Sequence, residues 1–253
     1  MIRLDVAEGI ARITLDRPPV NALDERMVEG LSRIVSEIEA ERSVRAVVLR
    51  SDLPVFCAGA DIRMLASFLE SSDGPSRLTA YAAHLQRVLA RIAALPIATI
   101  AEVGGAATGG GLELALACDI RIASDRARAG LPEATIGLVP GAGGTQRLAS
   151  VVGRSRALLT LLGGELLDAR RALEIGVLDE VLAPDELTAR VADIAATIAG
   201  RGRELVIEIK RCVAGAADGS GFHAELHATE RLASLPETRE LMDQFFSRRE
   251  LTT

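Results

Sequence analysis

The sequence contains no tryptophan, one tyrosine and five phenylalanines among its 253 residues. It also lacks a dense block of lysine and arginine, and its formal net charge of −6 argues against a nucleic-acid-binding protein. The three cysteines are widely spaced and form neither a disulfide framework nor a Cys-x-x-Cys metal motif. No uncharged run approaches the length of a membrane span, and the first residues show no secretory signal pattern. These absences predict a soluble, cytoplasmic protein that binds neither nucleic acid nor membrane.

The apolar residues that are present, 49% of the chain, are mostly aliphatic and suffice for a substantial core. Alternating apolar residues over 2–6 and 10–15, around a turn at Glu8-Gly9, predict a β-hairpin. A helical period covers residues 24–40, and the apolar run 44–49 is typical of a buried strand. Further strands are predicted over 97–103 and 119–124, and helices over 111–118, 132–136 and 144–152. This alternation predicts an α/β fold.

After Pro184 the patterns become helical. Segments 185–199, 203–217 and 222–249 are each predicted to form a helix, with glycine-containing turns between them. Within the earlier part of the chain, Ser71–Pro75 is predicted to be a polar, mobile loop. We therefore predict an α/β core over residues 1–195, followed by a helical region over residues 196–253.

Three glycines precede an acid in the stretch Gly109-Gly110-Gly111-Leu112-Glu113, between a predicted strand and a predicted helix. Glycine lets the backbone approach a ligand closely, and a helix start offers unpaired N–H groups and the positive end of a dipole. A developing negative charge could bind there, with the Glu113 carboxylate one turn away. On this segment alone, a glycine-rich turn with Glu113 as a first-turn charge explains the pattern equally well.

Two phosphate-binding interpretations of the glycines fail. Gly104-x-x-x-x-Gly109 has the spacing of a P-loop, but glycines follow where Lys and Ser or Thr are required. Gly141-x-Gly143 is followed by Gly144-Thr145-Gln146, which does not match the dinucleotide-binding fingerprint. Both of these phosphate-binding interpretations are therefore rejected.

Four segments, in their order and spacing, resemble the enoyl-CoA hydratase/isomerase (crotonase) superfamily. They cover residues 56–62, 104–113, 131–133 and 139–147. The similarity extends over nearly the whole chain, from the opening hairpin to the helical tail. It implies a crotonase-like spiral of ββα turns, and a C-terminal helical region that packs between subunits and completes the CoA site. It also implies a homotrimer or a dimer of trimers.

The resemblance assigns an oxyanion hole to the backbone N–H groups of Ala60 and Gly110, which would bind the thioester carbonyl oxygen of an acyl-CoA. Small neighbours such as Ala58 suit donors that belong to the backbone. Glu113 and Glu133 match the two glutamates of the family's hydratases. Adding water to a conjugated double bond needs a base for the water and a proton for Cα, and two carboxylates can supply both. Their mutual repulsion is expected to separate their pKa values, so that one proton is shared.

The resemblance gives weaker assignments to residues around this centre. Asp61 and Ile62 flank the oxyanion donor, and Asp61 could also cap the segment that follows. Arg63 occupies a position that is often basic in the family and could reach the nucleotide phosphates of CoA. Gly141 matches the glycine beside the active-site water. A surface arginine and a helix-entry turn explain Arg63 and Gly141 about equally well.

The C-terminal tail carries a second group of assignments. Phe245, Arg248 and Arg249 could contact the adenosine part of CoA, across a subunit interface, although an ordinary amphipathic helix explains them equally well. The tail from Pro236 departs from the family's usual turn, and segment 67–80 is longer than in short-chain hydratases. These departures leave open the CoA contacts of the C-terminus and the acyl specificity.

The resemblance therefore predicts an enoyl-CoA hydratase that forms 3-hydroxyacyl-CoA from trans-2-enoyl-CoA, without a metal or a redox cofactor. The CoA thioester is the substrate. A 3,2-enoyl-CoA isomerase or another CoA-enolate reaction is the nearest alternative, and the presence of both glutamates disfavours it. A non-catalytic or RNA-binding member of the superfamily is disfavoured by the net acidity and by the same two glutamates.

Overall fold

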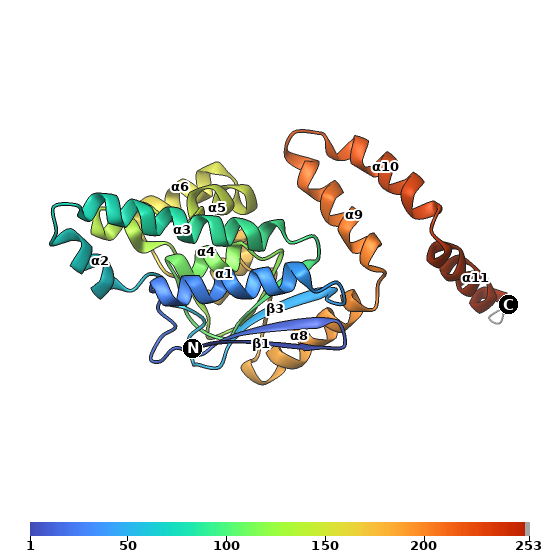
Figure 1. Cartoon of the computed structure of the whole chain (residues 1–253), viewed down its shortest axis with the longest axis horizontal. Coiled ribbons are helices and arrows are strands. Elements are labelled where there is room, and N and C mark those ends of the chain that lie inside the picture. Colours follow the sequence, from blue (N-terminus) through green and yellow to red (C-terminus); the bar gives the residue numbers. More distant parts are fainter. Residues whose placement is uncertain (251–253) are drawn as a thin grey trace.

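A six-stranded sheet forms the centre of the molecule in the computed structural model (Figure 1). The structure describes residues 1–250, without the side chains of residues 217 and 248–250. In spatial order the strands are β1 (Ile2–Ala7), β2 (Ile10–Leu15), β3 (Ala46–Ser51), β4 (Ala98–Val103), β6 (Ile120–Ser124) and β9 (Glu180–Leu182). Strands β1 and β2 are antiparallel, which confirms the predicted hairpin, and the other neighbouring pairs are parallel.

A smaller sheet lies beside the first and gives the fold its spiral character. Its strands are β5 (Ala107–Thr108), β7 (Arg128–Gly130) and β8 (Leu167–Asp168). Two successive turns of the chain each contribute a strand to the large sheet, a strand to the small sheet and then a helix. One turn is β4, β5 and α4 (Gly110–Leu116), and the next is β6, β7 and the 3₁₀ helix η1 (Pro132–Ile136). The predicted α/β spiral of ββα turns is confirmed.

Helices cover both faces of the large sheet. Helices α1 (Glu25–Ala40) and α3 (Gly74–Ala94) lie on one face, and α8 (Pro184–Ala199) lies on the other. The other helices of this part of the chain include α2 (Ile62–Leu69), α5 (Gly144–Val152), α6 (Arg154–Gly163) and α7 (Ala169–Ile175). Alternate strand residues explain the two layers. Ile13 and Leu49 face the main core with α1 and α3, whereas Val48 and Ile100 pack against Val191 of α8.

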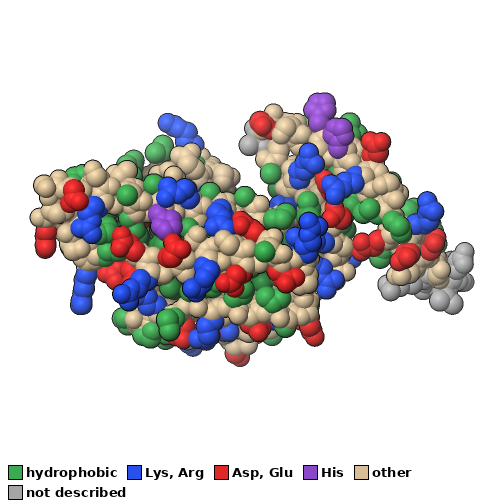
Figure 2. Space-filling view, viewed as in Figure 1, with side chains coloured by type: hydrophobic (Ala, Val, Ile, Leu, Met, Phe, Trp, Pro, Cys, Tyr) green, Lys and Arg blue, Asp and Glu red, His purple; other side chains and the backbone are tan. Residues whose placement is uncertain are grey.

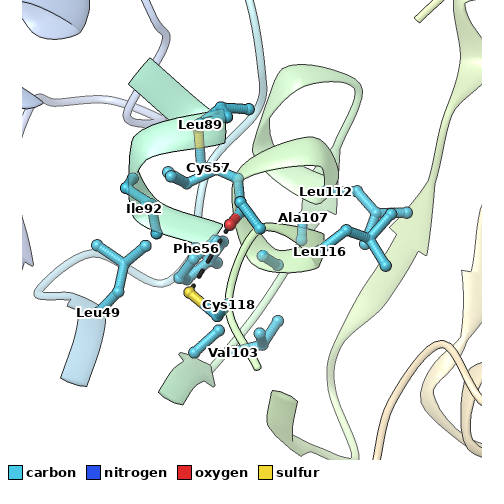
Figure 3. Packing of buried hydrophobic residues seen from close by; sticks show 14 of the residues in the cluster. Leu49, Phe56, Cys57, Leu89, Ile92, Val103, Ala107, Leu112, Leu116 and Cys118 are labelled. Carbon is cyan, nitrogen blue, oxygen red and sulfur yellow. Dashed lines mark hydrogen bonds between the residues drawn. The ribbon is translucent and has the colours of Figure 1, made fainter. Parts of the chain in front are cut away.

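The main core is almost entirely aliphatic where α4 crosses it (Figure 3). Leu112 and Leu116 of α4 pack beside Phe56 and Ala107, in line with the low aromatic content. A Cβ atom at position 111 would lie 2.0 Å from the carbonyl oxygen of Cys57. Only glycine fits such a close approach, so Gly111 lets α4 pack directly on the segment that carries Ala58 and Ala60.

Helices form the C-terminal region and extend away from the sheets (Figure 1). They are α9 (Arg203–Ala214), the 3₁₀ helix η2 (Gly215–Ala217), α10 (Gly221–Ala233) and α11 (Pro236–Glu250). The prediction of one helix over 222–249 was wrong, because the helix ends before Pro236 and a new one begins there. Proline has no N–H to donate and is tolerated in the first turn of a helix but not in its interior.

The predicted loop Ser71–Pro75 is also shorter than expected, because α3 already begins at Gly74 with proline in its first turn. The predicted division into residues 1–195 and 196–253 falls inside α8 and stays a prediction, as does the trimeric assembly. Within residues 1–250, no helix is both long enough and apolar enough to cross a membrane.

Candidate active site

A cavity of about 410 Å³ brings the predicted catalytic residues together. Helices α2 and α3 form one wall, and the segment from η1 to α5 forms another. The predicted site residues that line it are Ala58, Ala60, Ile62, Gly110, Glu113, Glu133 and Gly141. The remaining wall is mainly aliphatic, with Leu65, Leu78, Ala82, Leu85, Leu138 and Val139. Residues as far apart in the sequence as Ala58 and Gly141 thus share one apolar cavity that holds two carboxyl groups.

The backbone N–H groups of Ala60 and Gly110 lie close to each other at this cavity. A Cβ atom at position 110 would be 3.5 Å from the Ala60 nitrogen, and a Cβ atom at Gly59 would be 2.8 Å from the Gly110 nitrogen. Among the described residues, no acceptor takes either N–H group. Two free donors at an apolar cavity can bind one oxygen atom on which negative charge develops.

Glu113 belongs to α4 and is only 3% exposed. Its Oε1 accepts the backbone N–H groups of Ala142 and Gly144, each at 2.8 Å. Burial raises the pKa of Glu113, and these two hydrogen bonds together with the charge of Arg147 oppose that rise. Backbone donors therefore fix one oxygen of the carboxyl group and stabilise its ionised form.

Glu133 follows Pro132 in the first turn of η1 and is half-buried. Its Oε2 is buried and has no hydrogen-bond partner among the described residues. Burial, with a further contribution from the charge of Glu113, raises the pKa of Glu133 to about 7. Near neutral pH this carboxyl group can therefore either hold or release a proton.

Arg147 is a charged residue near Glu113 that the sequence interpretation did not single out. It lies within the glycine-rich segment 139–147, is half-buried, and donates from Nη1 to the carbonyl oxygen of Ala142 at 2.8 Å. Burial lowers the pKa of Arg147, and the negative charge of Glu113 opposes this change. The available signal in the sequence was an arginine just after the glycines, but its burial and the direction of its side chain are set by the tertiary fold.

Asp61 and Arg63 have different environments in the structure. Asp61 caps α2, as expected, by accepting the backbone N–H groups of Arg63 at 3.1 Å and Met64 at 3.3 Å. Its carboxylate also pairs with Arg17 at 3.1 Å. The side chain of Arg63 is exposed on α2 and does not line the cavity.

Phe245 lies far along the chain in a second cavity of about 460 Å³, among residues of α9, α10 and α11. It is not part of the cavity that holds the two glutamates. The side chains of Arg248 and Arg249 lie outside the described residues, so the CoA contacts of the tail stay a prediction. Among the described residues, no three His, Cys, Asp or Glu side chains are grouped to hold a metal ion.

Comparisons with known proteins agree with this geometry. Residues 5–251 match the family model described as enoyl-CoA hydratase/isomerase. YngF of Bacillus subtilis, provisionally named an enoyl-CoA hydratase/isomerase, is 37% identical over 96% of this chain and 93% of its own. Human mitochondrial methylglutaconyl-CoA hydratase is 40% identical over 64% of this chain and 47% of its own.

A solved structure shows the same similarity in three dimensions. The crystal structure of enoyl-CoA hydratase from Bacillus anthracis superimposes with a TM-score of 0.91 at 31% identity, covering 98% of this chain and 96% of that chain. The family model and the overall fold thus agree over almost the whole length. The chain belongs to the enoyl-CoA hydratase/isomerase family of enzymes.

Proposed function

We propose that this enzyme is a hydratase that adds water across the 2,3 double bond of a trans-2-enoyl-CoA to give a 3-hydroxyacyl-CoA. The observation that carries the proposal is the presence of two carboxyl groups with different environments in one apolar cavity, next to two free backbone N–H groups. Glu113 is held by two backbone donors, and Glu133 has a pKa of about 7.

The N–H groups of Ala60 and Gly110 bind the thioester oxygen and stabilise the enolate charge that develops when a nucleophile attacks Cβ. Such preorganised donors are worth roughly 3–4 kcal/mol each. The Glu113 carboxylate removes a proton from water, and the resulting hydroxide oxygen bonds to Cβ. Electrons move through the double bond onto the thioester oxygen, and Glu133 delivers its proton to Cα as the enolate collapses.

The two glutamates together neither gain nor lose a proton over one turnover. After one turnover Glu113 holds the proton taken from water, and Glu133 has lost the one given to Cα. Transfer of a single proton from Glu113 to Glu133 restores the starting state. The reaction involves no net oxidation or reduction, so the proposal requires no redox cofactor, and the CoA thioester enters as substrate.

Double-bond isomerisation is the alternative within the same family. It moves one proton along one face of the substrate and can use a single carboxyl group. A second acid of raised pKa beside Glu113 therefore favours hydration. The RNA-binding alternative needs a basic face, whereas basic and acidic side chains are interspersed on the face shown in Figure 2.

The test is product analysis with both kinds of substrate. Hydration of crotonyl-CoA and of longer 2-enoyl-CoAs should remove the absorbance of the conjugated thioester and yield 3-hydroxyacyl-CoA. Glu113→Gln and Glu133→Gln should each retain binding and lose several orders of magnitude in kcat. Conversion of 3-enoyl-CoA into 2-enoyl-CoA, without hydration of any 2-enoyl-CoA, would assign the enzyme to isomerisation instead.

A further inference from the structure

Tyr81 is the chain's single tyrosine, and the proposed mechanism gives it no role. It lies on α3, lines the cavity of the two glutamates and is only 8% exposed. Its ring packs edge-on against Phe68, with ring centroids 6.5 Å apart. Its hydroxyl donates to the carbonyl oxygen of Leu23 at 2.7 Å, which fixes a contact between residues 58 positions apart in sequence.

Leu23 in turn holds the segment that contains the proposed oxyanion donor. The Leu23 N–H donates to the carbonyl oxygen of Gly59 at 2.7 Å, and the Asp61 N–H donates to the carbonyl oxygen of Leu23 at 3.2 Å. These bonds form a parallel bridge between Leu23 and Ala60. The backbone of Leu23 is therefore hydrogen-bonded to the residues on both sides of Ala60.

The first of these bonds sets the direction of the donor itself. The Gly59 carbonyl and the Ala60 N–H belong to one planar trans peptide, in which the two groups point in opposite directions. Because the Gly59 carbonyl points at Leu23, the Ala60 N–H points away from Leu23. Gly59 has a φ of 86°, and a Cβ atom there would lie 2.6 Å from the Thr108 carbonyl oxygen, so this conformation requires glycine. A shift of Leu23 would turn the Ala60 peptide.

The position of Leu23 depends on Tyr81. A carbonyl oxygen accepts at two lone pairs, and at Leu23 the Asp61 N–H and the Tyr81 hydroxyl occupy them. Burial raises the pKa of the Tyr81 phenol, so the group stays a hydrogen-bond donor throughout the working pH range. Without the Tyr81 hydroxyl, the buried Leu23 carbonyl would keep only the longer of its two hydrogen bonds, the one from the Asp61 N–H.

We propose that Tyr81 is a positioning residue of the oxyanion hole, acting through the Leu23 carbonyl to aim the Ala60 N–H at the thioester oxygen. The inference rests on the proposed function, because it takes Ala60 as the donor to an acyl-CoA. It connects the cavity wall formed by α3 with the backbone that polarises the substrate. Tyr81 does not exchange a proton with the substrate in this account.

The variant Tyr81→Phe tests the proposal because it keeps the ring and removes only the hydroxyl. The kcat for hydration of crotonyl-CoA should fall roughly 10- to 100-fold, as expected when a reacting group is misplaced, with KM within about 3-fold of wild type. Ser124→Ala is the matched control. Ser124 is fully buried outside the cavity, and its hydroxyl donates to the Gly104 carbonyl at 2.8 Å. This variant should lose thermal stability but keep the wild-type kcat.

A spectroscopic readout separates positioning from general stability. Isotope-edited infrared spectra of bound [1-¹³C]butyryl-CoA should show a lowered carbonyl stretching frequency in wild type and a smaller lowering in Tyr81→Phe. In Ser124→Ala the frequency should equal that of wild type. Wild-type kcat and carbonyl frequency in Tyr81→Phe would overturn the proposal for Tyr81 and leave the hydratase function intact. A wild-type enzyme that binds butyryl-CoA but hydrates no enoyl-CoA would overturn the function, and the carbonyl frequencies would still decide the role of Tyr81.

Discussion

The carboxylate of Glu113 accepts the backbone N–H of Gly144 at 2.8 Å, and a Cβ atom at position 144 would lie 2.9 Å from the same oxygen. Gly144 thus supplies a hydrogen bond and leaves the space that the carboxylate occupies. The glycine-rich segment at the start of α5 therefore holds the proposed base, while the glycines at the start of α4 present one of the two proposed oxyanion donors.

We expect Gly144→Ala to disturb Glu113 without unfolding the protein. The new methyl group would also lie 2.8 Å from Cβ of Pro140 and 3.0 Å from Cγ of Glu113, so both side chains must shift and the carboxylate moves relative to its backbone donors. Steady-state assays with crotonyl-CoA should show a fall in kcat of about 100-fold. Gly163→Ala, at a helical position with open space around Cβ, is the control and should keep the wild-type rate. An equal kcat in the two variants would contradict the placement of Glu113.

Arg147 should affect the pH at which Glu113 ionises, and with it the pH dependence of the hydration rate. Its positive charge lowers the pKa of Glu113, so Arg147→Met should raise that pKa and move the acid limb of kcat/KM for hydration to higher pH. Arg147→Lys retains the charge and should move the limb less. The measurement is the pH–rate profile of each variant. Arg170→Met, which alters a side chain that is 87% exposed, should superimpose on wild type, and an unmoved acid limb in Arg147→Met would argue against this coupling.

The hairpin and the alternating core could be predicted from local periodicity in the sequence. The meeting of the glutamates with the glycine segments was predicted only through the resemblance to the enoyl-CoA hydratase/isomerase family. The region that includes the start of α3 was expected to shape the acyl pocket, but no helix was predicted there, because Ser71–Pro75 looks like a loop although Pro75 suits the first turn of a helix. The end of α10 and the start of a new helix at Pro236 were not predicted, because the apolar pattern continues from one helix into the next.

The contacts of Tyr81 and Arg147 could not be predicted. Each depends on a side chain meeting a backbone carbonyl, and in the case of Tyr81 that carbonyl is 58 residues away. Backbone groups carry no sequence signature of their own. Hydrogen bonds between a side chain and a distant backbone carbonyl can be identified only in the tertiary structure, which sets the direction of both groups.

Glu133 should give the two directions of the reaction the same pH dependence. Hydration needs the proton on Glu133, and dehydration of 3-hydroxyacyl-CoA needs it on Glu113, so both directions use the pair that holds one proton. As pH rises through about 7, the pKa of Glu133, the pair loses that proton, and kcat/KM for hydration and for dehydration should fall together. Initial rates in both directions over about pH 5 to 9 test this. A kcat/KM for hydration that does not fall above about pH 7 would remove Glu133 from the acid role.

The same pKa predicts a dependence of stability on pH. The folded-state pKa of about 7 exceeds the ordinary value of 4.5, so folding takes up protons between these values. The stabilising contribution of protonated Glu133 is complete below about pH 4.5 and is lost as pH rises through 7. In urea unfolding, wild type should therefore lose stability relative to Glu133→Gln as pH rises from 4.5 to above 7. A constant difference across that range would contradict the raised pKa.

The cavity should also discriminate between acyl groups by charge. Its charged lining residues are Glu113 and Glu133, both acidic, and the remaining wall is mainly aliphatic. A 2-enoyl-CoA whose acyl chain ends in a carboxylate should therefore have a kcat/KM at least roughly 10-fold below that of an uncharged chain of equal length.

A matched pair of variants tests this selectivity. Val139 lines the cavity and is 74% exposed, so a longer side chain there can be accommodated. Val139→Lys should improve kcat/KM for the carboxylate-ended substrate, and Val139→Met should not. Equal turnover of both substrates by wild type would show that the acyl chain does not lie against this wall.

In the proposed mechanism, Glu113 and Glu133 together add water to a CoA-bound double bond. The most direct test is mass spectrometry of the acyl-CoA formed from crotonyl-CoA in ¹⁸O-labelled water. With wild type, the product should gain the mass of one labelled water as 3-hydroxyacyl-CoA, and with Glu113→Gln or Glu133→Gln this product should be nearly absent over the same time. Recovery of unlabelled crotonyl-CoA with wild type, or equal labelling by wild type and both variants, would contradict the account.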